Sequence, residues 1–242
     1  MIIVGLSGGI ASGKSTVSTL LQNASVPLVD LDKLARAVVA PSDSSGTLKA
    51  LVKAFGNGIL TPNGELDRPA LGRIAFGDDA KRATLNRITH GAIRRRMAWT
   101  LVRMWLTGER LVVVDAPLLV EAGLWKWCAR TVIVWCSPED QLSRMLSRDG
   151  AAGLTEEDAR SRLAAQHSLA SKLPYADVIL DNSSALQGSD AGSQGSGAGA
   201  SPALRSQVQE LVHEWRRETT SLLGTLTWLI CWLAPPLGLL AG

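Results

Sequence analysis

The sequence predicts a three-layer α/β fold, in which a five-stranded parallel sheet is covered by helices on both faces. Short apolar runs alternate with longer stretches of helical periodicity along the 242 residues, as in parallel sheets whose strands are joined by helices. The runs are apolar nearly throughout and rich in β-branched residues, as strands buried on both faces are. We expect the strands at Ile2–Leu6, Val26–Val29, Leu111–Asp115, Thr131–Cys136 and Val178–Leu180.

Helices are expected between and after these strands. Thr155 marks a helix start, because its hydroxyl can cap the first turn and the three acids after it lie at the positive end of the helix dipole. An insertion of helices over about residues 41–107 separates the second strand from the third. The expected helices are Lys14–Gln22, Leu31–Val39, 47–56, 69–76, 80–88, 91–107, Pro138–Arg148, Thr155–Gln166 and Pro202–Thr220.

The chain is expected to form one domain followed by a C-terminal appendage. With 46% hydrophobic residues, the chain can bury one sizeable core, which we place in residues 1–183. Residues 184–201 are rich in Gly, Ser and Ala, so they bury too little apolar surface to fold and are predicted to be a flexible linker. A helix over residues 202–221 and a hydrophobic tail over residues 222–242 follow.

Composition argues against several classes of protein. The net charge is only +3, the basic residues are dispersed and aromatic residues make up 5%, so no nucleic-acid partner is expected. The three cysteines form no C-x-x-C pair and indicate reduced thiols inside a cell. The three histidines lack the spacing of metal ligands, so no metal cage of protein side chains is predicted.

A phosphate-binding loop is predicted between the first strand and the first helix, where the sequence matches the P-loop pattern G-x-x-x-x-G-K-[ST]. Glycine lets the backbone turn and approach phosphate closely, so that backbone N–H groups face the anion. Lys14 would reach the β- and γ-phosphates of ATP, and the Ser15 hydroxyl would bind Mg²⁺. The expected nucleotide-binding residues are Gly8, Gly9, Ile10, Ala11, Ser12, Gly13, Lys14, Ser15 and Thr16.

The P-loop pattern is specific enough to predict a P-loop NTPase fold. A chance match in a chain of this length is on the order of one in a hundred, and here the pattern follows a predicted strand and opens a predicted helix. The guanine-reading sequence N-K-x-D is absent. The loop alone does not separate kinases from switch GTPases or motors, so the choice depends on the residues around it.

Acidic residues at the ends of two predicted strands favour phosphoryl transfer. Asp30 and Asp32 follow the second strand, at the sheet edge that borders ligands in parallel α/β folds. Carboxylates there can accept a proton from an alcohol and hold magnesium-bound water. Asp115 ends the third strand and is predicted to face the magnesium ion. Capping of a following helix is the alternative for all three.

Three arginines predict a lid over about residues 144–166. Arg144, Arg148 and Arg162 lie on two expected helices that are joined by a glycine-containing hinge at 149–155. On closure, such arginines would neutralise charge on the transferred phosphoryl group. The alternative is a basic helix face that only contacts solvent.

Together, these motifs resemble the dephospho-coenzyme A kinase family. The resemblance runs in order over residues 1–183, about three quarters of the chain. It is carried by GLSGGIASGKSTV (5–17), VDLDKLARAVV (29–39), ELDRPALGRIAF (65–76), LNRITH (85–90), DAPLLVEAGL (115–124), LAAQ (163–166) and ADVILDNS (176–183).

The resemblance implies that the chain uses ATP and Mg²⁺ to phosphorylate the ribose 3′-hydroxyl of dephospho-coenzyme A, the last step of coenzyme A synthesis. The catalytic residues would be Asp32 as the base, Lys14 and Arg148. The acceptor would be bound by Asp30, Arg36, Arg68, His90, Leu118 and Glu121, in a helical acceptor-binding insertion and around the loop after the third strand. The family commonly has His-Pro where this chain has His90-Gly91, and a proline lost from a helix start costs little.

Two other functions remain open at this point. The chain could be another small-molecule P-loop kinase, acting on a nucleoside monophosphate or a sugar acid. It could also be a membrane-tethered nucleotide-binding protein without catalysis. Asp32 and the lid arginines count against the second, since binding alone needs neither.

The C-terminal tail predicts attachment to a membrane. Residues 222–241 are uncharged, and as a helix they would just cross a hydrocarbon core of about 30 Å. The tail also resembles a hydrophobic extension of eukaryotic members of the family. We therefore expect an intracellular protein that is cytoplasmic or held on an organelle membrane. Packing against protein and a dispensable tail are the alternatives, since Pro235-Pro236 interrupts the helix. The sequence predicts no oligomeric state.

Overall fold

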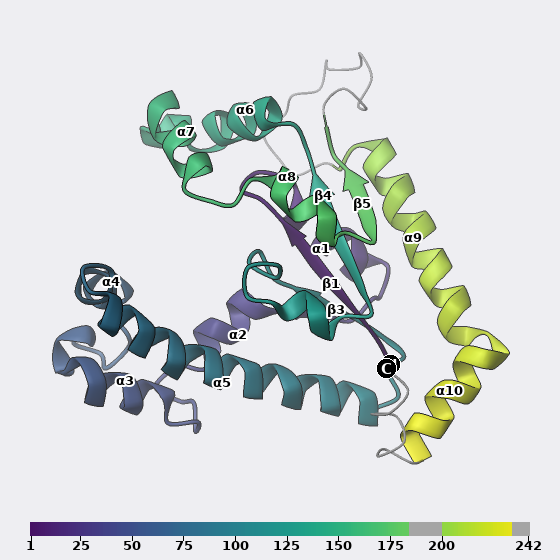
Figure 1. The fold of residues 1–242 in the computed structure, drawn as a ribbon, viewed down its shortest axis with the longest axis horizontal. Helices are drawn as coiled ribbons and strands as arrows, with labels where there is room; N and C mark the ends of the chain where they lie inside the picture. Colours follow the sequence, from purple (N-terminus) through teal and green to yellow (C-terminus); the bar gives the residue numbers. More distant parts are fainter. Residues whose placement is uncertain (184–199, 234–242) are drawn as a thin grey trace. The chain divides into compact units, whose positions relative to one another are not determined.

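The computed structural model describes residues 1–183 and 200–233 and places five strands in one sheet. Figure 1 shows most of these strands with the helices around them. The predicted parallel α/β fold is confirmed, with strand ends within about two residues of those expected. Of the predicted linker at 184–201, residues 184–199 lie outside the described residues. The strands are β1 (Ile2–Gly8), β2 (Leu28–Asp30), β3 (Leu111–Asp115), β4 (Arg130–Trp135) and β5 (Val178–Asp181), in the order β2-β3-β1-β4-β5.

β1 runs through the middle of the sheet, parallel to β3 on one side and to β4 on the other. Leu6 pairs with Asp115 of β3 and with Val132 of β4. β4 in turn pairs in parallel with β5, where Trp135 lies beside Asp181. Because parallel strands end at the same edge of a sheet, the turn after β1 lies close to the acid that ends β3.

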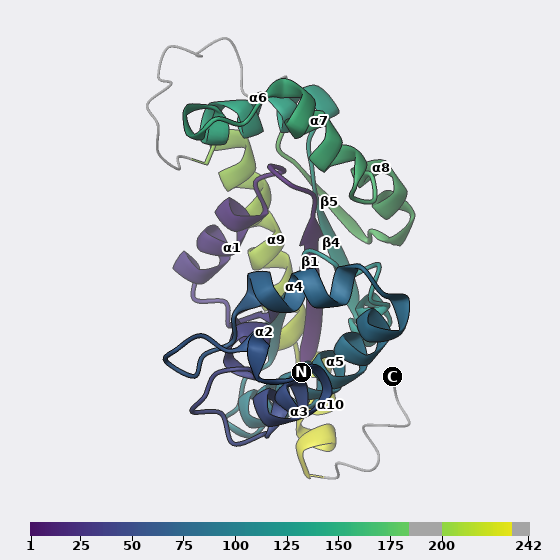
Figure 2. The ribbon, with the colours of Figure 1, turned by 90° about the vertical axis from the view of Figure 1, so that its left-hand side faces the viewer.

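The chain divides into two compact units, residues 1–28 with 105–242 and residues 29–104. The first unit holds most of the sheet and six helices among its described residues. α6 packs beside α7, and α9 lies beside both α1 and β5 (Figure 2). The helices are α1 (Lys14–Asn23), α6 (Pro138–Asp149), α7 (Glu156–Ala164), α8 (Leu169–Lys172), α9 (Pro202–Thr220) and α10 (Leu222–Leu233).

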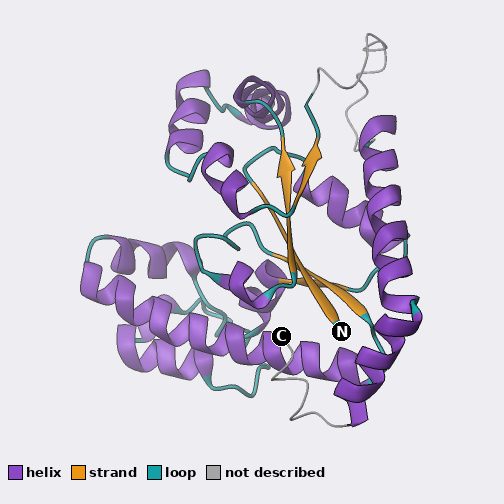
Figure 3. Cartoon of the chain, turned by 45° about the vertical axis from the view of Figure 1, so that its right-hand side comes forward, coloured by secondary structure: helices purple, strands orange, loops and turns teal. Residues whose placement is uncertain are grey.

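The strands, drawn in orange in Figure 3, pack with α1 and α9 in the main core cluster of the first unit. Along α9, buried residues recur every three or four positions, which places them in one stripe on the helix. This stripe packs with buried residues of β1, β3, β4, β5 and α1. Its members are Leu204, Val208, Leu211, Val212 and Trp215.

One side chain of α9 binds the backbone of β5. The Gln207 Oε1 atom accepts a hydrogen bond from the Asp181 N–H at 3.0 Å, and Gln207 Nε2 donates to the Asp181 carbonyl at 3.0 Å. The side-chain amide therefore pairs with Asp181 as a neighbouring backbone would, and it fixes the strand end immediately before Asn182.

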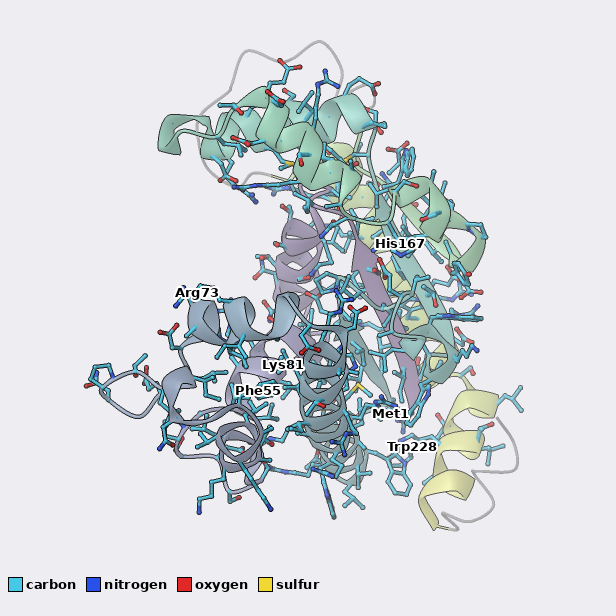
Figure 4. The ribbon with its side chains drawn as sticks, turned by 60° about the vertical axis from the view of Figure 1, so that its left-hand side comes forward. Met1, Phe55, Arg73, Lys81, His167 and Trp228 are labelled. Carbon is cyan, nitrogen blue, oxygen red and sulfur yellow. The ribbon has the colours of Figure 1, made fainter. Side chains whose placement is uncertain are left out.

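The second unit is helical and has its own core. Figure 4 labels one side chain on each of three of its helices, Phe55 on α3, Arg73 on α4 and Lys81 on α5. Its helices are α2 (Leu31–Ala37), α3 (Thr47–Phe55), α4 (Arg68–Phe76) and α5 (Asp79–Leu106), of which the last two residues belong to the first unit. Its buried cluster consists of Val38, Val39, Leu51, Ile59, Leu71 and Ala92.

The prediction of a helix boundary after His90 is wrong. The sequence predicts two helices at 80–88 and 91–107, whereas the structure has one continuous helix, α5. Gly91 lies in its interior, where glycine costs about 1 kcal/mol relative to alanine but does not end a helix. Buried Ala92 and Met97 lie just after this point and support the helix through packing.

α10 follows α9 after a sharp bend at Ser221. A side chain at Gly224 would collide with the Glu218 carbonyl oxygen, so only glycine fits this bend. The Arg110 guanidinium lies 5.3 Å from the centre of the Trp228 ring and holds α10 by a cation–π contact. Met1 and Trp228 both line a hollow beside this contact (Figure 4).

The described part of the apolar tail is too short for a membrane span. α10 has 12 residues, about 18 Å of helix against a hydrocarbon core of about 30 Å. Within residues 1–183 and 200–233, no helix combines the length and the apolar character that crossing a bilayer requires. Residues 234–242, including Pro235-Pro236, lie outside the described residues.

Candidate active site

The turn between β1 and α1 forms a compact loop with backbone angles that favour glycine. β1 ends at Gly8, and α1 begins at Lys14. Gly13 has a φ of 93°, in the left-handed region that residues with side chains rarely adopt. A side chain at Gly13 would also collide with the amide of Asn182, so this position requires glycine for two independent reasons.

The N-terminus of α1 is open toward an anion. Gly13 caps the helix without a side-chain hydrogen bond, and the first turn carries no acidic residue. The N–H groups at a helix start and the partial positive charge of its dipole favour bound phosphate. The exposed Ser15 lies in this first turn, and its hydroxyl makes no hydrogen bond with a described residue.

Four carbonyl groups of the loop are held by side chains from outside it. The C=O and N–H groups of a trans peptide point in opposite directions. Anchoring the carbonyls outward therefore turns the neighbouring N–H groups toward the concave side, where phosphate binds in such loops. The donors are Lys172 Nζ to Gly8 at 3.5 Å, Gln141 Nε2 to Ile10 at 2.6 Å, Arg144 Nη1 to Ala11 at 3.5 Å and Asn182 Nδ2 to Ser12 at 2.9 Å.

Arg144, predicted as a lid arginine, is one of the four residues whose side chains hold carbonyl groups of the loop. Besides Ala11, it donates from Nη2 to the Asn182 carbonyl at 2.6 Å. The buried Cys136 thiol also approaches the Ala11 carbonyl, with 3.9 Å between Sγ and O. Burial raises the pKa of Cys136 to about 11, so the thiol is protonated at neutral pH and acts as a weak donor.

Asp115 lies at the carboxyl end of β3 and contacts the loop lysine directly. Its Oδ1 is 2.5 Å from Lys14 Nζ, and its Oδ2 accepts a hydrogen bond from the Ser18 hydroxyl at 2.6 Å. Only 7% of the carboxylate side chain is exposed. The carboxylate therefore binds side chains of α1 and does not cap a following helix, as the alternative interpretation required.

Glu121, predicted to bind the acceptor, pairs with a buried lysine. The Lys172 ammonium is 2.8 Å from Glu121 Oε1 and also donates to the Pro117 carbonyl at 2.8 Å. The neighbouring Leu118 is 56% exposed. Of the two predicted acceptor residues in this segment, Leu118 is accessible to solvent without a charged partner, whereas the Glu121 side chain is 17% exposed and paired with Lys172.

The two acids after β2 have different surroundings. Asp30 caps α2, because its Oδ1 accepts a hydrogen bond from the Lys33 N–H at 3.0 Å. Asp32 lies in the first turn of α2, is exposed, and has no hydrogen bond or ion pair with another described residue. The capping interpretation therefore holds for Asp30, while the Asp32 carboxylate is accessible to a ligand.

The remaining predicted acceptor residues lie in the second unit on three helices. Arg36 is in the last turn of α2, Arg68 is the first residue of α4, and His90 is in the middle of α5. All three are exposed and make no ion pair with a described residue. Their side chains are accessible to an anionic ligand.

Arg148 lies in the last turn of α6 and binds its neighbour in sequence, Asp149. Its Nε and Nη2 atoms donate to the two carboxylate oxygens of Asp149, each at 2.8 Å. This hydrogen-bonded pairing raises the pKa of Arg148 and lowers the pKa of Asp149 below its usual value. Both residues are charged at neutral pH, and the two bonds to Asp149 use only some of the five N–H donors of the guanidinium.

Sequence reasoning missed three of the four side chains that hold the loop. Asn182 offered a usable signal, because it is a polar residue directly after a strand, where ligand sites gather in parallel sheets. Gln141 offered a weaker one, since it lies one helical turn before the buried Met145 on the core side of α6. Lys172 offered none, because its helix has only four residues.

Comparison with known proteins indicates the family of this chain. The family model described as dephospho-CoA kinase matches residues 2–188. A dephospho-CoA kinase of Arabidopsis thaliana is 43% identical over 232 residues, which cover 96% of this chain and 88% of the relative. A dephospho-CoA kinase of Geobacillus kaustophilus is 42% identical over 181 residues, covering 75% of this chain and 88% of the relative.

Solved structures give the same result for the fold. The crystal structure of TT1252 from Thermus thermophilus matches with a TM-score of 0.66 and 29% identity, covering 88% of this chain and 97% of that one. A dephospho-CoA kinase from Campylobacter jejuni matches with a TM-score of 0.55 and 22% identity, covering 88% and 96%, and supports the fold alone. With the family model matching more than three quarters of its length, the chain belongs to the dephospho-CoA kinase family.

Proposed function

We propose that this protein transfers the γ-phosphoryl group of ATP to the ribose 3′-hydroxyl of dephospho-coenzyme A. The observation that carries this proposal is the loop after β1, where the open start of α1, Lys14 and the outward-held carbonyls form a site for a triphosphate. The relatives that match over most of the chain are named for this activity.

The residues of the loop fit a magnesium-bound nucleotide. Glycines stand where side chains would collide, since a Cβ at Gly9 would lie 2.8 Å from Gln141 Nε2. Mg²⁺ would be held by the Ser15 hydroxyl together with phosphate oxygens, and it would neutralise charge that develops on them. Lys14 would exchange its contact with Asp115 for the β- and γ-phosphates, since its ammonium can rotate about a flexible stem.

Most of the proposed acceptor residues belong to the second unit. Asp32 would accept the proton of the 3′-hydroxyl, because its carboxylate is exposed and has no competing partner among the described residues. Arg36, Arg68 and His90 would bind the anionic part of the acceptor. Arg148 would leave Asp149 and stabilise the charge on the transferred phosphoryl group.

An acceptor panel tests this function directly. The purified protein is incubated with Mg²⁺ and ATP and with dephospho-coenzyme A, nucleoside monophosphates or sugar acids in parallel. We expect ADP release with dephospho-coenzyme A alone, and a product phosphorylated at the 3′ position by mass spectrometry and NMR. Turnover of a nucleoside monophosphate without turnover of dephospho-coenzyme A would overturn the proposal.

We further propose that the C-terminal tail holds the protein on an organelle membrane. The three leucines Leu223, Leu226 and Leu229 recur along α10 and are 75%, 55% and 38% exposed. An exposed apolar helix face favours insertion into a lipid interface. Flotation with liposomes tests this: the full chain should float, and a variant with serine at all three positions should not. A full chain that stays in the soluble fraction would contradict the proposal.

A further inference from the structure

The buried ammonium of Lys172 joins three segments of the first unit. The side chain is only 3% exposed. Its Nζ lies 2.8 Å from the Pro117 carbonyl, 2.8 Å from Glu121 Oε1 and 3.5 Å from the Gly8 carbonyl. A lysine ammonium has three N–H donors. Each donor therefore has one acceptor, and the charge has a carboxylate to balance it.

Two of these acceptors belong to the machinery that faces the nucleotide. Gly8 is the first residue of the phosphate-binding loop, and its carbonyl fixes the orientation of the peptide that leads into the loop. The Pro117 carbonyl also accepts a hydrogen bond from the Ser7 hydroxyl at 3.0 Å. Lys172 and Ser7 thus hold the backbone two residues after Asp115, the residue that contacts Lys14.

The third acceptor, Glu121, forms an ion pair with Lys172. Its side chain is 17% exposed, and a buried ion that loses its partner is strongly unfavourable. A Glu121 that turned away to bind the acceptor would leave the charge of Lys172 without its counter-ion. The geometry therefore favours a role for Glu121 as the counter-ion of Lys172.

We infer that Lys172, with Glu121 as its counter-ion, is a positioning residue for the nucleotide half of the site. It sets the entry of the phosphate-binding loop relative to the segment that carries Asp115, so that Lys14 lies between Asp115 and the phosphates. It touches neither substrate. This inference rests on the proposed function only in assuming that the loop binds ATP.

The test compares Lys172→Met and Glu121→Gln with the unchanged protein. Methionine keeps the length of the side chain without the charge, and glutamine keeps an acceptor oxygen without the charge. Affinity for a fluorescent ATP analogue is measured without any acceptor, followed by kcat and by KM for ATP and for dephospho-coenzyme A. All measurements are made well below the midpoint of unfolding of each variant.

We expect Lys172→Met to weaken ATP binding and lower kcat, each by roughly tenfold to a hundredfold, because displacing reacting groups by about 1 Å has effects of this size. The KM for the acceptor should change by less than about twofold. Glu121→Gln should lower ATP affinity and kcat by smaller factors. In the double variant, the loss of each quantity should be smaller than the product of the two single losses, because the residues act as a pair.

A destabilised control separates positioning from loss of stability. Trp215→Phe alters the buried stripe of α9. The indole Nε1 of Trp215 makes no hydrogen bond with a described residue, so the substitution breaks no bond to the loop. It should lower the midpoint of unfolding and leave affinity for ATP unchanged. An equal loss of ATP affinity in this control would reduce Lys172 to a structural role and overturn the inference.

Other outcomes are equally decisive. Unchanged ATP affinity and kcat in Lys172→Met would overturn the inference, and if that variant does not fold, Glu121→Gln alone decides. A Glu121→Gln variant that raises only the acceptor KM would make Glu121 an acceptor ligand instead. If the unchanged protein binds ATP but phosphorylates a different acceptor, the proposed function fails while the inference about Lys172 is still tested by ATP affinity.

Discussion

Single residues around the loop combine two kinds of constraint. Gly13 needs both a left-handed backbone and the absence of a side chain, because the Asn182 amide that holds the Ser12 carbonyl occupies the adjacent space. The P-loop pattern predicts the glycine. It does not predict Asn182, which lies 169 positions further along the chain. Asn182 meets the loop because β5 lies only one strand away from β1 in the sheet and ends at the same edge.

Gly13→Ala should strongly weaken nucleotide binding. The new methyl group would force Asn182 away from the loop and strain the backbone at a φ of 93°. We expect affinity for ATP to fall by at least about a hundredfold, since displacements near 1 Å have effects of this size. Titration with a fluorescent ATP analogue measures it.

Gly108→Ala is the matched control for this substitution. Gly108 has a φ of 95°, and nothing lies within 4 Å of a Cβ built there. The control should cost about 1–2 kcal/mol of stability from backbone strain alone and leave ATP affinity unchanged. Retained binding in Gly13→Ala would show that the loop tolerates a displaced Asn182.

Asp32→Asn should separate binding from catalysis. The amide cannot accept the proton of the acceptor hydroxyl, so kcat should fall by roughly two to four orders of magnitude while ATP affinity stays within about twofold. Rapid-quench kinetics with dephospho-coenzyme A measures the chemical step.

Asp67→Asn controls for the change of charge in the second unit. Asp67 caps α4 through the Ala70 N–H at 2.9 Å, and asparagine caps helices equally well. This variant should keep both stability and rate. An undiminished rate in Asp32→Asn would remove the proposed base.

Among the elements, the strands and most helices follow from hydrophobic periodicity. The predicted cap at Thr155 is confirmed, because its hydroxyl accepts a hydrogen bond from the Asp158 N–H at 3.1 Å. The errors arise where local pattern competes with packing. α5 continues through Gly91, since buried residues after the glycine keep the helix in place, and α8 is too short to show a period.

Alanine at two helical glycines should act in opposite directions. At Gly91 nothing lies within 4 Å of the new methyl group, so Gly91→Ala should stabilise the protein by about 0.5–1 kcal/mol in denaturant titrations. At Gly224 the methyl group would collide with the Glu218 carbonyl, so Gly224→Ala should release α10 from Arg110.

Hydrogen exchange distinguishes these two effects. Amides of residues 222–233 should exchange faster in Gly224→Ala, while the strands keep their protection. Protection that is unchanged in α10 would mean that the bend adapts to a side chain. A destabilised Gly91→Ala would contradict the continuous helix α5.

At the scale of the whole molecule, the two units have separate hydrophobic cores, one around the sheet and one within residues 29–104. The order of motifs predicted a single kinase domain with a helical insertion. How a kinase places its base against its phosphate loop depends on contacts across long distances in sequence, which periodicity and motif spacing do not encode.

Magnesium and ATP should raise the midpoint of thermal unfolding. At a ligand concentration about a hundred times its dissociation constant, binding adds about 2.7 kcal/mol to the folded state. For a chain of this size that corresponds to roughly 5–10 °C. Lys14→Ala should lose most of this shift, and differential scanning calorimetry measures both. An equal shift in Lys14→Ala would place the nucleotide elsewhere.

The pairing of Gln207 with Asp181 also covers backbone groups at the edge of the sheet. An outermost strand offers unpaired backbone groups on which another chain can add a strand. At the end of β5, the backbone N–H and C=O groups of Asp181 are both hydrogen-bonded to the side-chain amide of Gln207. A foreign strand would have to displace both bonds and the α9 stripe behind them. The backbone of Asp181 is therefore not available for pairing with a sixth strand.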